Sequence, residues 1–552
     1  MIFDAGKLPR DETLETEICI IGTGPAGITL AKEFIGGDFR VILLESGTFE
    51  FDQATQSLCD GEIGEPLRPY HLRARQFGGT CNKWGIQIGN GKQGIRYAPF
   101  DEIDFEKRDW LPYSGWPFSK SHLDPFYEKA HSFCQIGPYN YEATTWEDNE
   151  GRQIKFKGNQ VITTVFQFGA RDVFLQNYLK DIKAAPNITT YLKANVVNIE
   201  TNDTANLVLR VKVATLNGNQ FWVKAKTFIL ATGGLENARL LLLSNQTQKT
   251  GLGNQHDLVG RFFMDHFMIY CGMLLPSTKK IFDQTIFYDL RCVKGIPIMG
   301  KLALTQQTMR EQQLLNTATY LIPRYKTYHL QRMSLRALEI LQSSLKQKKI
   351  YPNMARYLNR LIGGKLTHIV HAIPRKITRR PFYYASIAEG GWSSLPNKEQ
   401  EFALFEIQHL VEQAPDFNNR VRLSEELDLL GYRKIKIERR LRDIDIKSIQ
   451  KTQKILQKEF ALSGFGELFI DEEELDFQRT LPLVPGSSHH IGTTRMHLDP
   501  KQGVVNENCQ VHGISNLFIA GSSVFPTGSY ANPTLTIIAL AIRLAAHIKT
   551  LM

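Results

Sequence analysis

The sequence predicts an α/β fold with two lobes, one built on a parallel sheet and the other on an antiparallel sheet with helices. Residues 15–47 read as a strand, a glycine-rich turn, a helix and a second strand, which is the pattern of a parallel β-α-β unit. Residues 268–323 instead alternate apolar and polar side chains, as antiparallel strands do. At 552 residues the chain is long enough for two or more lobes.

The glycine-rich turn has the spacing Gly22-x-Gly24-x-x-Gly27. In such a unit the first glycine permits the tight turn, the second lets a pyrophosphate approach the backbone, and the third lets helix and strand pack closely. Glu45 ends the second strand 21 positions after Gly24, where a carboxylate binds ribose hydroxyls and repels a 2′-phosphate. The unit is therefore Rossmann-like and predicts a dinucleotide site that suits FAD or NAD better than NADP. A plain glycine turn is the alternative.

The bulk composition is that of a globular protein, with 42% hydrophobic and 22% charged residues. The longest apolar stretch near the C-terminus contains Arg543 and His547, so no membrane-spanning helix is expected. No export signal is recognisable at the N-terminus, and the seven cysteines are scattered without C-x-x-C spacing. These observations favour a cytoplasmic protein with reduced thiols and no zinc or iron–sulfur site.

Three later stretches are candidates for cofactor contact. In residues 71–85 the bare backbone of 78–80 suits a cofactor running alongside it, and Asn82 and Trp84 can cover one side of a flat ring. Residues 191–200 form a strand that can present a backbone group to an adenine ring. Residues 229–241 are an apolar strand that ends in Ala-Thr-Gly-Gly and opens a helix. A surface glycine loop and a strand–helix corner are the alternatives for the first and last stretches.

One segment carries the basic charge of the whole chain. Residues 323–380 contain 14 Lys or Arg and a single acid, Glu339, so their net charge of +13 exceeds the +10 of the chain. Apolar residues recur there at helical spacing, which indicates basic amphipathic helices. Such helices suit an anionic membrane surface or an acidic partner, or form a solvated excursion packed on their own lobe. Nucleic acid is not expected, because no binding motif accompanies the charge.

Two polar residues near the C-terminus, His489 and Asn532, are candidate catalytic groups. A helix predicted over 535–549 follows Pro533, which fits a first helical turn, and its start can face an anion or a flavin carbonyl. A metal site at His489 and His490 is not expected, since no carboxylate or third histidine stands at ligand spacing.

Five motifs in order along nearly the whole chain resemble the glucose–methanol–choline (GMC) flavin oxidoreductases. They are G-T-G-P-A-G, F-G-G-T, A-T-G-G-L-E-N-A-R, H-H-I-G-T and N-P-T-L. The pairing of His489 with Asn532 is most similar to the pyranose 2-oxidase branch, with its bacterial sugar and glycoside dehydrogenases. Lys83 stands where pyranose 2-oxidases place the histidine that bonds covalently to the flavin, and His497 stands where a glycine is usual. The resemblance therefore implies FAD, held non-covalently.

The resemblance also implies a reaction and a set of site residues. The reaction is oxidation of an alcohol, a sugar or glycoside hydroxyl, with His489 as base and Asn532 holding the substrate oxygen. The implied FAD contacts are Gly22, Gly24, Pro25, Ala26, Gly27, Glu45, Arg75, Gly78, Gly79, Thr80, Asn82, Val196, Ala231, Gly233, Asn237, Gly521, Asn532 and Thr534. The implied substrate contacts are Gln413, His489 and Asn532. Oxygen, a quinone or a small carrier would accept the electrons.

Two other function classes stay open at this point. One is a lyase that keeps a redox-silent FAD, as some relatives do, and the other is a membrane-associated binding protein with a vestigial site. Asp265 and His266 are either functional or a satisfied corner. The expected domains are an FAD-binding part, a cap region, a second FAD-binding part, a substrate domain with the basic insert, and a C-terminal FAD-binding part, at 1–115, 116–184, 185–268, 269–483 and 484–552.

Overall fold

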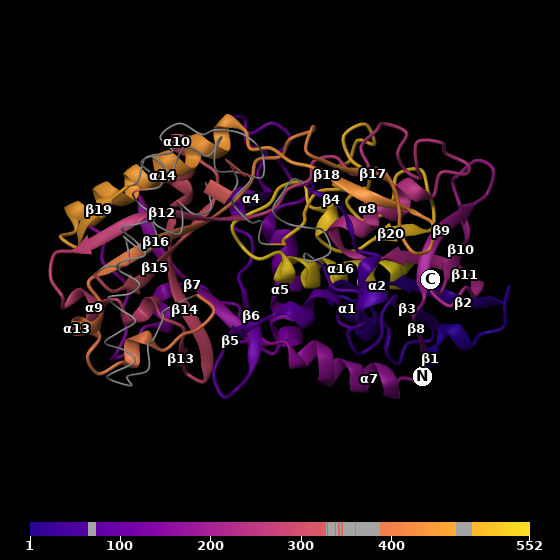
Figure 1. Ribbon diagram of the computed structural model, residues 1–552, viewed down its shortest axis with the longest axis horizontal. Coiled ribbons are helices and arrows are strands. Elements are labelled where there is room, and N and C mark those ends of the chain that lie inside the picture. Colours follow the sequence, from indigo (N-terminus) through magenta and orange to yellow (C-terminus); the bar gives the residue numbers. More distant parts are fainter. Residues whose placement is uncertain are drawn as a thin grey trace.

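The computed structural model describes residues 1–63, 73–326, 387–470 and 488–552, with seven single positions between 328 and 359. These residues form two large sheets and one small sheet. The two large sheets lie toward opposite ends of the long axis (Figure 1). Most of the predicted basic helices of 323–380, and the first residues of the predicted segment 484–552, lie outside the described residues.

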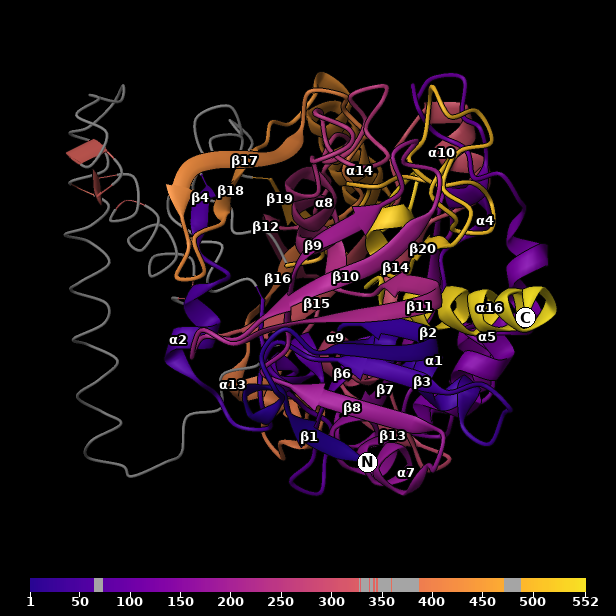
Figure 2. The same cartoon turned by 90° about the vertical axis from the view of Figure 1, so that its right-hand side faces the viewer.

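The first sheet has a parallel centre. Its strands follow the order β1-β8-β3-β2-β11-β10-β9, with β20 also paired to β11, and Figure 2 shows this order from its lower to its upper part. All four residues of β3 are buried, because a parallel strand covered on both faces is apolar throughout. The bounds are β1 Ile2–Asp4, β2 Thr13–Ile21, β3 Val41–Leu44, β8 Ile188–Leu192, β9 Asn195–Thr201, β10 Val208–Ala214, β11 Gln220–Leu230 and β20 Leu517–Ile519.

The second sheet is antiparallel, as the alternation over 268–323 predicts. Its order is β19-β12-β16-β15-β14-β7-β6-β5, with β13 on β14. The strands β5 and β6 come from the predicted segment 1–115 but pair in this sheet, so the domain boundaries stay a prediction. The bounds are β5 Ile86–Gln87, β6 Gln93–Tyr97, β7 Val161–Ala170, β12 Phe267–Pro276, β13 Arg291–Val293, β14 Ile296–Leu304, β15 Thr317–Arg324, β16 Leu404–Val411 and β19 Gly466–Phe469.

A small third sheet joins a hairpin to a strand from far upstream. The hairpin strands β17 (Arg420–Leu427) and β18 (Arg433–Glu438) are antiparallel, and β4 (Gly61–Ile63) runs parallel to β18. This sheet lies against α8 (Gly233–Leu243), which follows β11 of the first sheet. The third sheet therefore places the hairpin beside the segment that the sequence predicts as a cofactor contact.

The helices fill the space between and around the sheets, and one continuous apolar core joins the two lobes. Among them α16 packs against α1 and α5. The bounds of the helices not given above are α1 Pro25–Phe34, α2 Gln53–Ser57, α4 Glu102–Phe105, α5 Lys120–Cys134, α6 Ala143–Trp146, α7 Tyr178–Ala184, α9 Ile281–Gln284, α10 Gln306–Gln312, α13 Lys398–Glu401, α14 Asp443–Leu462 and α16 Thr534–Leu551.

The C-terminal helix differs from the sequence expectation in one respect. By length and composition alone α16 is able to cross a membrane, with 18 residues and a mean hydropathy of 1.5, although it contains Arg543 and His547. However, 67% of this helix is buried inside the protein against α1 and α5. Burial of this kind is typical of the core helix of a globular fold.

Candidate active site

A cavity of about 430 Å³ lies where the carboxyl ends of the parallel strands meet the second lobe. It gathers residues from the N-terminal, middle and C-terminal parts of the chain. The sequence-predicted residues that line it are Gly22, Gly24, Pro25, Ala26, Glu45, Arg75, Gly79, Thr80, Val196, Ala231, Gly233, His489, Gly521 and Thr534. The predicted residues that do not line it are Gly27, Gly78, Asn82, Asn237, Gln413 and Asn532.

The glycine-rich turn has the geometry that its spacing predicts. Gly22 has a φ of +105°, and a Cβ on it would lie 2.6 Å from the carbonyl oxygen of Ala231. A Cβ on Gly27 would lie 1.9 Å from the carbonyl oxygen of Gly22, so helix and strand touch there. A Cβ on Gly24, the residue before α1, would meet no atom within 4 Å. The start of α1 therefore presents bare backbone to the cavity, as a pyrophosphate site requires.

Glu45 lies at the edge of the cavity with its carboxylate held in place. Its Oε1 accepts the backbone N–H of Gly47 at 2.7 Å, and its Oε2 accepts the backbone N–H of Thr23 at 3.1 Å. The hydroxyl of Thr23 also donates to Oε2. These bonds fix the carboxylate beside the turn, where it can accept the hydroxyl groups of a ribose.

Two of the predicted FAD contacts instead hold the walls of the cavity together. Asn82 donates from Nδ2 to the carbonyl oxygens of Phe77 and Gly79, at 2.8 and 2.9 Å, so its amide closes the glycine loop. The fully buried Asn237 accepts the backbone N–H of Thr232 at 3.0 Å and donates to Ser523 Oγ at 2.9 Å. It thus joins the loop after β11 to the loop after β20.

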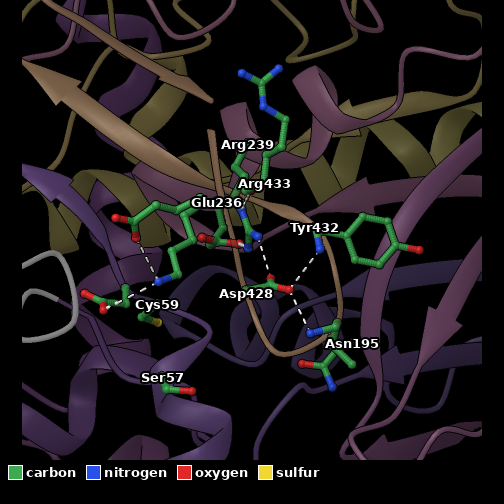
Figure 3. Close-up of polar contacts among 12 residues, drawn as sticks. Ser57, Cys59, Asn195, Glu236, Arg239, Asp428, Tyr432 and Arg433 are labelled. Atoms are coloured by element: carbon green, nitrogen blue, oxygen red, sulfur yellow. Dashed lines mark hydrogen bonds and ion pairs between the residues drawn. The ribbon is translucent and has the colours of Figure 1, made fainter. Parts of the chain in front are cut away.

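Glu236 anchors a cluster of arginines at one end of the cavity. It accepts hydrogen bonds from Arg73, from Arg75 at 2.7 Å and from Arg239 at 3.3 Å. Burial alone would raise the pKa of Glu236, but the guanidinium groups of Arg75, Arg239 and Arg73 lower that pKa overall. Arg239 also binds Asp428 at 2.6 Å, which ties α8 to the β17–β18 hairpin (Figure 3). Arg75 is therefore held at the cavity wall, where its charge faces the site of an anionic cofactor.

His489 brings a neutral imidazole into the same cavity. Burial, together with the charges of His266, Arg96 and His490, lowers the pKa of His489 well below its usual value. Its Nδ1 is fully buried without a partner in the described part of the chain, whereas Nε2 is not among such atoms. Nε2 is thus the nitrogen that can exchange a proton with a molecule in the cavity. The ring of His266 stands edge-on to it, with centroids 5.1 Å apart.

His490 also lines the cavity, but packing accounts for its ring. It stacks on Phe263 with centroids 5.9 Å apart, and burial lowers its pKa to about 3. Its carbonyl oxygen accepts the hydroxyl of Ser522 at 2.6 Å. A Cβ on Gly234 would lie 2.3 Å from the same carbonyl oxygen, so this backbone fills the corner next to α8.

Asp265 and His266 are more than a satisfied corner, because they hold the His489 segment. Asp265 Oδ1 accepts the backbone N–H groups of His266 at 2.8 Å and of His489 at 2.9 Å. Burial raises the pKa of Asp265 to about 6, against the opposing effects of Arg439 and of these N–H groups. The ring of His266 bonds from Nδ1 to the carbonyl oxygen of Tyr530 at 3.1 Å. Asp265 and His266 together thus link the His489 segment to the chain just before Asn532.

The side chain of Gln413 is fully occupied by backbone groups. Its Oε1 accepts the N–H of Asp265 at 3.0 Å, and its Nε2 donates to the carbonyl oxygen of Arg440 at 3.1 Å. Both contacts support the Asp265 loop, so Gln413 acts on His489 through Asp265. Its predicted contact with substrate stays a prediction.

Asn532 is buried beside Arg96, a residue that the sequence reasoning missed. Arg96 Nε donates to Asn532 Oδ1 at 3.2 Å, and the charge of Arg96 also acts on His489 and His266. The two predicted catalytic residues therefore share one neighbour. A charged residue within the buried part of strand β6 was the available signal for Arg96, and an acid in the first turn of α8 was the signal for Glu236.

Comparisons with known proteins agree with this geometry. The sequence profile of the family described as GMC oxidoreductase matches residues 415–541, which contain both His489 and Asn532. The C-terminal part of the chain thus matches the GMC oxidoreductase family. The chain is 25% identical to the fructose dehydrogenase large subunit of Gluconobacter japonicus, over 97% of this chain and 98% of that one. It is 21% identical to paromamine 6'-oxidase of Streptomyces fradiae, over 97% of this chain and 92% of that one.

A solved structure shows the same fold at low sequence identity. Formate oxidase of Aspergillus oryzae RIB40 superposes with a TM-score of 0.54 at 15% identity, over 98% of this chain and 99% of that chain. The family match and the glycine-rich dinucleotide site together indicate FAD as the cofactor. The residues present fit it, because Gly24, Gly233 and Gly521 each leave open space where a side chain would stand. The start of α1 would face the pyrophosphate of FAD, Glu45 would bind its ribose, and Arg75 would supply a positive charge.

Proposed function

We propose that this protein acts as a GMC oxidoreductase and oxidises a hydroxyl group of a sugar or glycoside. The observation that carries the proposal is the position of His489, a neutral imidazole in the cavity that holds the FAD-binding residues. Relatives named for fructose and paromamine support the choice of a carbohydrate. A short stretch is also 45% identical to a C-glycoside 3-oxidase of Arthrobacter globiformis, over 13% of this chain and 14% of that one.

The chain's own groups supply the proton chemistry. Bound FAD provides the acceptor for the hydride that leaves the substrate carbon. His489 takes the hydroxyl proton at Nε2, because burial and the neighbouring positive charges keep its imidazole neutral and therefore able to accept a proton. Asn532 is not among the residues that line the cavity, but its NH2 is available to the same substrate oxygen, because its Oδ1 is occupied by Arg96. This donor stabilises the negative charge that develops on the oxygen.

The substitution His489→Ala tests the assignment directly. It should slow flavin reduction by a bound sugar at least about 100-fold and leave FAD bound, since a positioned base contributes on the order of 10²–10⁴ in rate. His490→Ala is the matched control and should cost much less. The measurement is the bleaching of the yellow flavin band after anaerobic mixing. Reversed effects would move the base to His490, and no effect of either would remove this mechanism.

A panel of sugars and electron acceptors tests which substrate and which acceptor the protein uses. We propose oxygen, a quinone or a small carrier as the electron acceptor, to be measured as steady-state rates with each. Absence of bleaching with every sugar and alcohol would favour a lyase with redox-silent FAD, or a binding protein with a vestigial site.

We also propose a cytoplasmic location, which agrees with the seven free cysteines, of which Cys292 is exposed.

A further inference from the structure

Arg96 is a buried cation that binds Asn532 and acts through its charge on His489. It lies on β6 and is only 6% exposed. Its guanidinium carbon lies 5.7 Å from the ring centroid of Phe166 and 5.5 Å from that of Tyr320. These two rings are themselves stacked, with centroids 5.9 Å apart. Its Nε donates to Asn532 Oδ1 at 3.2 Å. Contacts with two aromatic rings and one amide hold the guanidinium in a single orientation.

The charge of Arg96 has no carboxylate to balance it in the described part of the chain. Two other buried arginines are paired with carboxylates, Arg108 with Glu412 and Arg324 with Glu406. Removing an unpaired charge from water is expensive, so such a group is usually retained for a function. The fully buried nitrogens without a partner include Nε and Nη1 of Arg495 but neither terminal nitrogen of Arg96. The two terminal nitrogens of Arg96 therefore keep access to open space.

The hydrogen bond to Asn532 decides which end of its amide is available to a substrate. An amide has one acceptor end and one donor end. Because the acceptor Oδ1 faces the Nε–H of Arg96, the donor NH2 must point elsewhere. A reversed amide would place two N–H groups against each other and would offer an acceptor to an oxygen that is gaining negative charge. Arg96 thus selects the orientation that stabilises an alkoxide.

The same charge acts on the histidine. The groups that act on or contact His489 are the imidazoles of His266 and His490, the guanidinium of Arg96 and the carboxylate of Asp265, which binds its backbone N–H. Behind Asp265 stands Arg439, 3.9 Å from that carboxylate. After burial and His266, Arg96 is the next cause of the low pKa of His489. A proton on His489 would face this fixed positive charge.

We propose that Arg96 is a positioning residue for the reaction proposed above, which fixes the Asn532 amide as a donor and keeps His489 in its neutral form. The inference rests on the proposed function for the role of the donor. Its effect on the protonation of His489 does not depend on any substrate. The two parts are therefore testable separately.

Three variants separate the charge of Arg96 from its geometry. Arg96→Met removes both, and a thioether chain is compatible with the neighbouring rings. Arg96→Lys keeps the charge but loses the Nε–H in its fixed plane. Lys301→Met is the matched control, because Lys301 is a buried cation of the same lobe that binds the hydroxyl of Tyr530 at 2.7 Å and not Asn532. FAD content and melting temperature show that each variant is folded.

The first measurement is the titration of His489 by NMR in protein labelled with ¹³C at the histidine ring. The His489 signal is assigned by its loss in His489→Ala. In Arg96→Met the pKa of His489 should rise, since a like charge has been removed. In Arg96→Lys and Lys301→Met it should stay close to that of the unmodified protein. An unchanged pKa in Arg96→Met would overturn the electrostatic part of the proposal.

The second measurement is the rate of flavin reduction across pH. Arg96→Met should lower the rate by about 10²-fold, the usual loss of one oxyanion donor, and should shift the acid limb of kcat/KM to higher pH. Arg96→Lys should lower the rate without moving that limb. Equal rates in Arg96→Met and the unmodified protein would refute the positioning role. If the unmodified protein reduces no flavin with any alcohol, the proposed function fails, while the NMR result still decides the effect on His489.

Discussion

The substitution Asp265→Asn should make the protein more stable at alkaline pH while leaving the His489 segment in place. The pKa of Asp265 rises from its ordinary 3.8 to about 6 on folding, because the carboxyl group is buried. The stability that the neutral form provides is fully present below about pH 4 and is lost as pH rises through about 6. At 1.4 kcal/mol per pKa unit, the ionised carboxylate costs about 3 kcal/mol at pH 8. Asn keeps Oδ1 as an acceptor and cannot ionise.

Thermal unfolding at two pH values measures this effect. For a chain of this length, 3 kcal/mol corresponds to a rise in Tm of about 3 °C at pH 8, and about half of that is expected at pH 5. The gain is an upper bound, because Arg439 loses its carboxylate partner. Asp416→Asn is the opposite control. Burial would raise the pKa of Asp416, but its hydrogen bond with Arg440 and other contacts lower this pKa overall. Asp416→Asn should therefore lose stability at pH 8.

Two outcomes would refute the reasoning about Asp265. One is a Tm difference between Asp265→Asn and the unmodified protein that is the same at pH 5 and pH 8. The other is a large loss of flavin reduction in Asp265→Asn, which would show that the charge itself, and not the acceptor Oδ1, supports His489. Asp265→Ala should be worse in both assays, because each buried N–H left without an acceptor costs about 1–3 kcal/mol.

Three further predictions concern the cofactor and the basic segment. Gly24→Ala should fold but purify without yellow colour, because its methyl group enters the cavity, whereas Gly27→Ala should lower Tm or prevent folding, since its Cβ meets a carbonyl oxygen at 1.9 Å. Acid precipitation should release all the flavin, because Lys83 replaces the linking histidine, and a yellow pellet would contradict this. Anionic liposomes should sediment the protein at low salt and release it at high salt if residues 323–380 bind a charged surface, and protein left in the supernatant at low salt would favour the solvated excursion packed on its own lobe.

Much of the fold follows from local patterns in the sequence. The glycine turn, β2, α1 and β3 lie where residues 15–47 predict them, because a buried parallel strand and an amphipathic helix each leave a clear periodicity. The helix predicted over 535–549 is found as α16, which begins one residue earlier and ends two residues later. The position of β5 and β6 in the second sheet was not predictable, since strand pairing across lobes leaves no local signal.

The candidate site was predictable where function depends on backbone and not where it depends on charge pairing. Glycines such as Gly22 and Gly24 are recognisable because few other residues tolerate their geometry. The partners of Arg75 and Asn532 cannot be recognised in the same way. Glu236 lies 161 positions from Arg75, and Arg96 lies 436 positions from Asn532. Only the folded chain shows that Asn237 joins two loops and that Gln413 is bonded to backbone groups.

The strand β20 has a consequence for how the protein is made. It occupies the place beside β11, yet it is synthesised almost 290 residues later, and α16 follows it onto α1. A nascent chain on the ribosome can form the β-α-β unit early, but one edge of the parallel strands stays unpaired until the last few dozen residues emerge. Tight capture of FAD is therefore a late event of biosynthesis, and the growing chain must keep this edge from pairing with other chains until then.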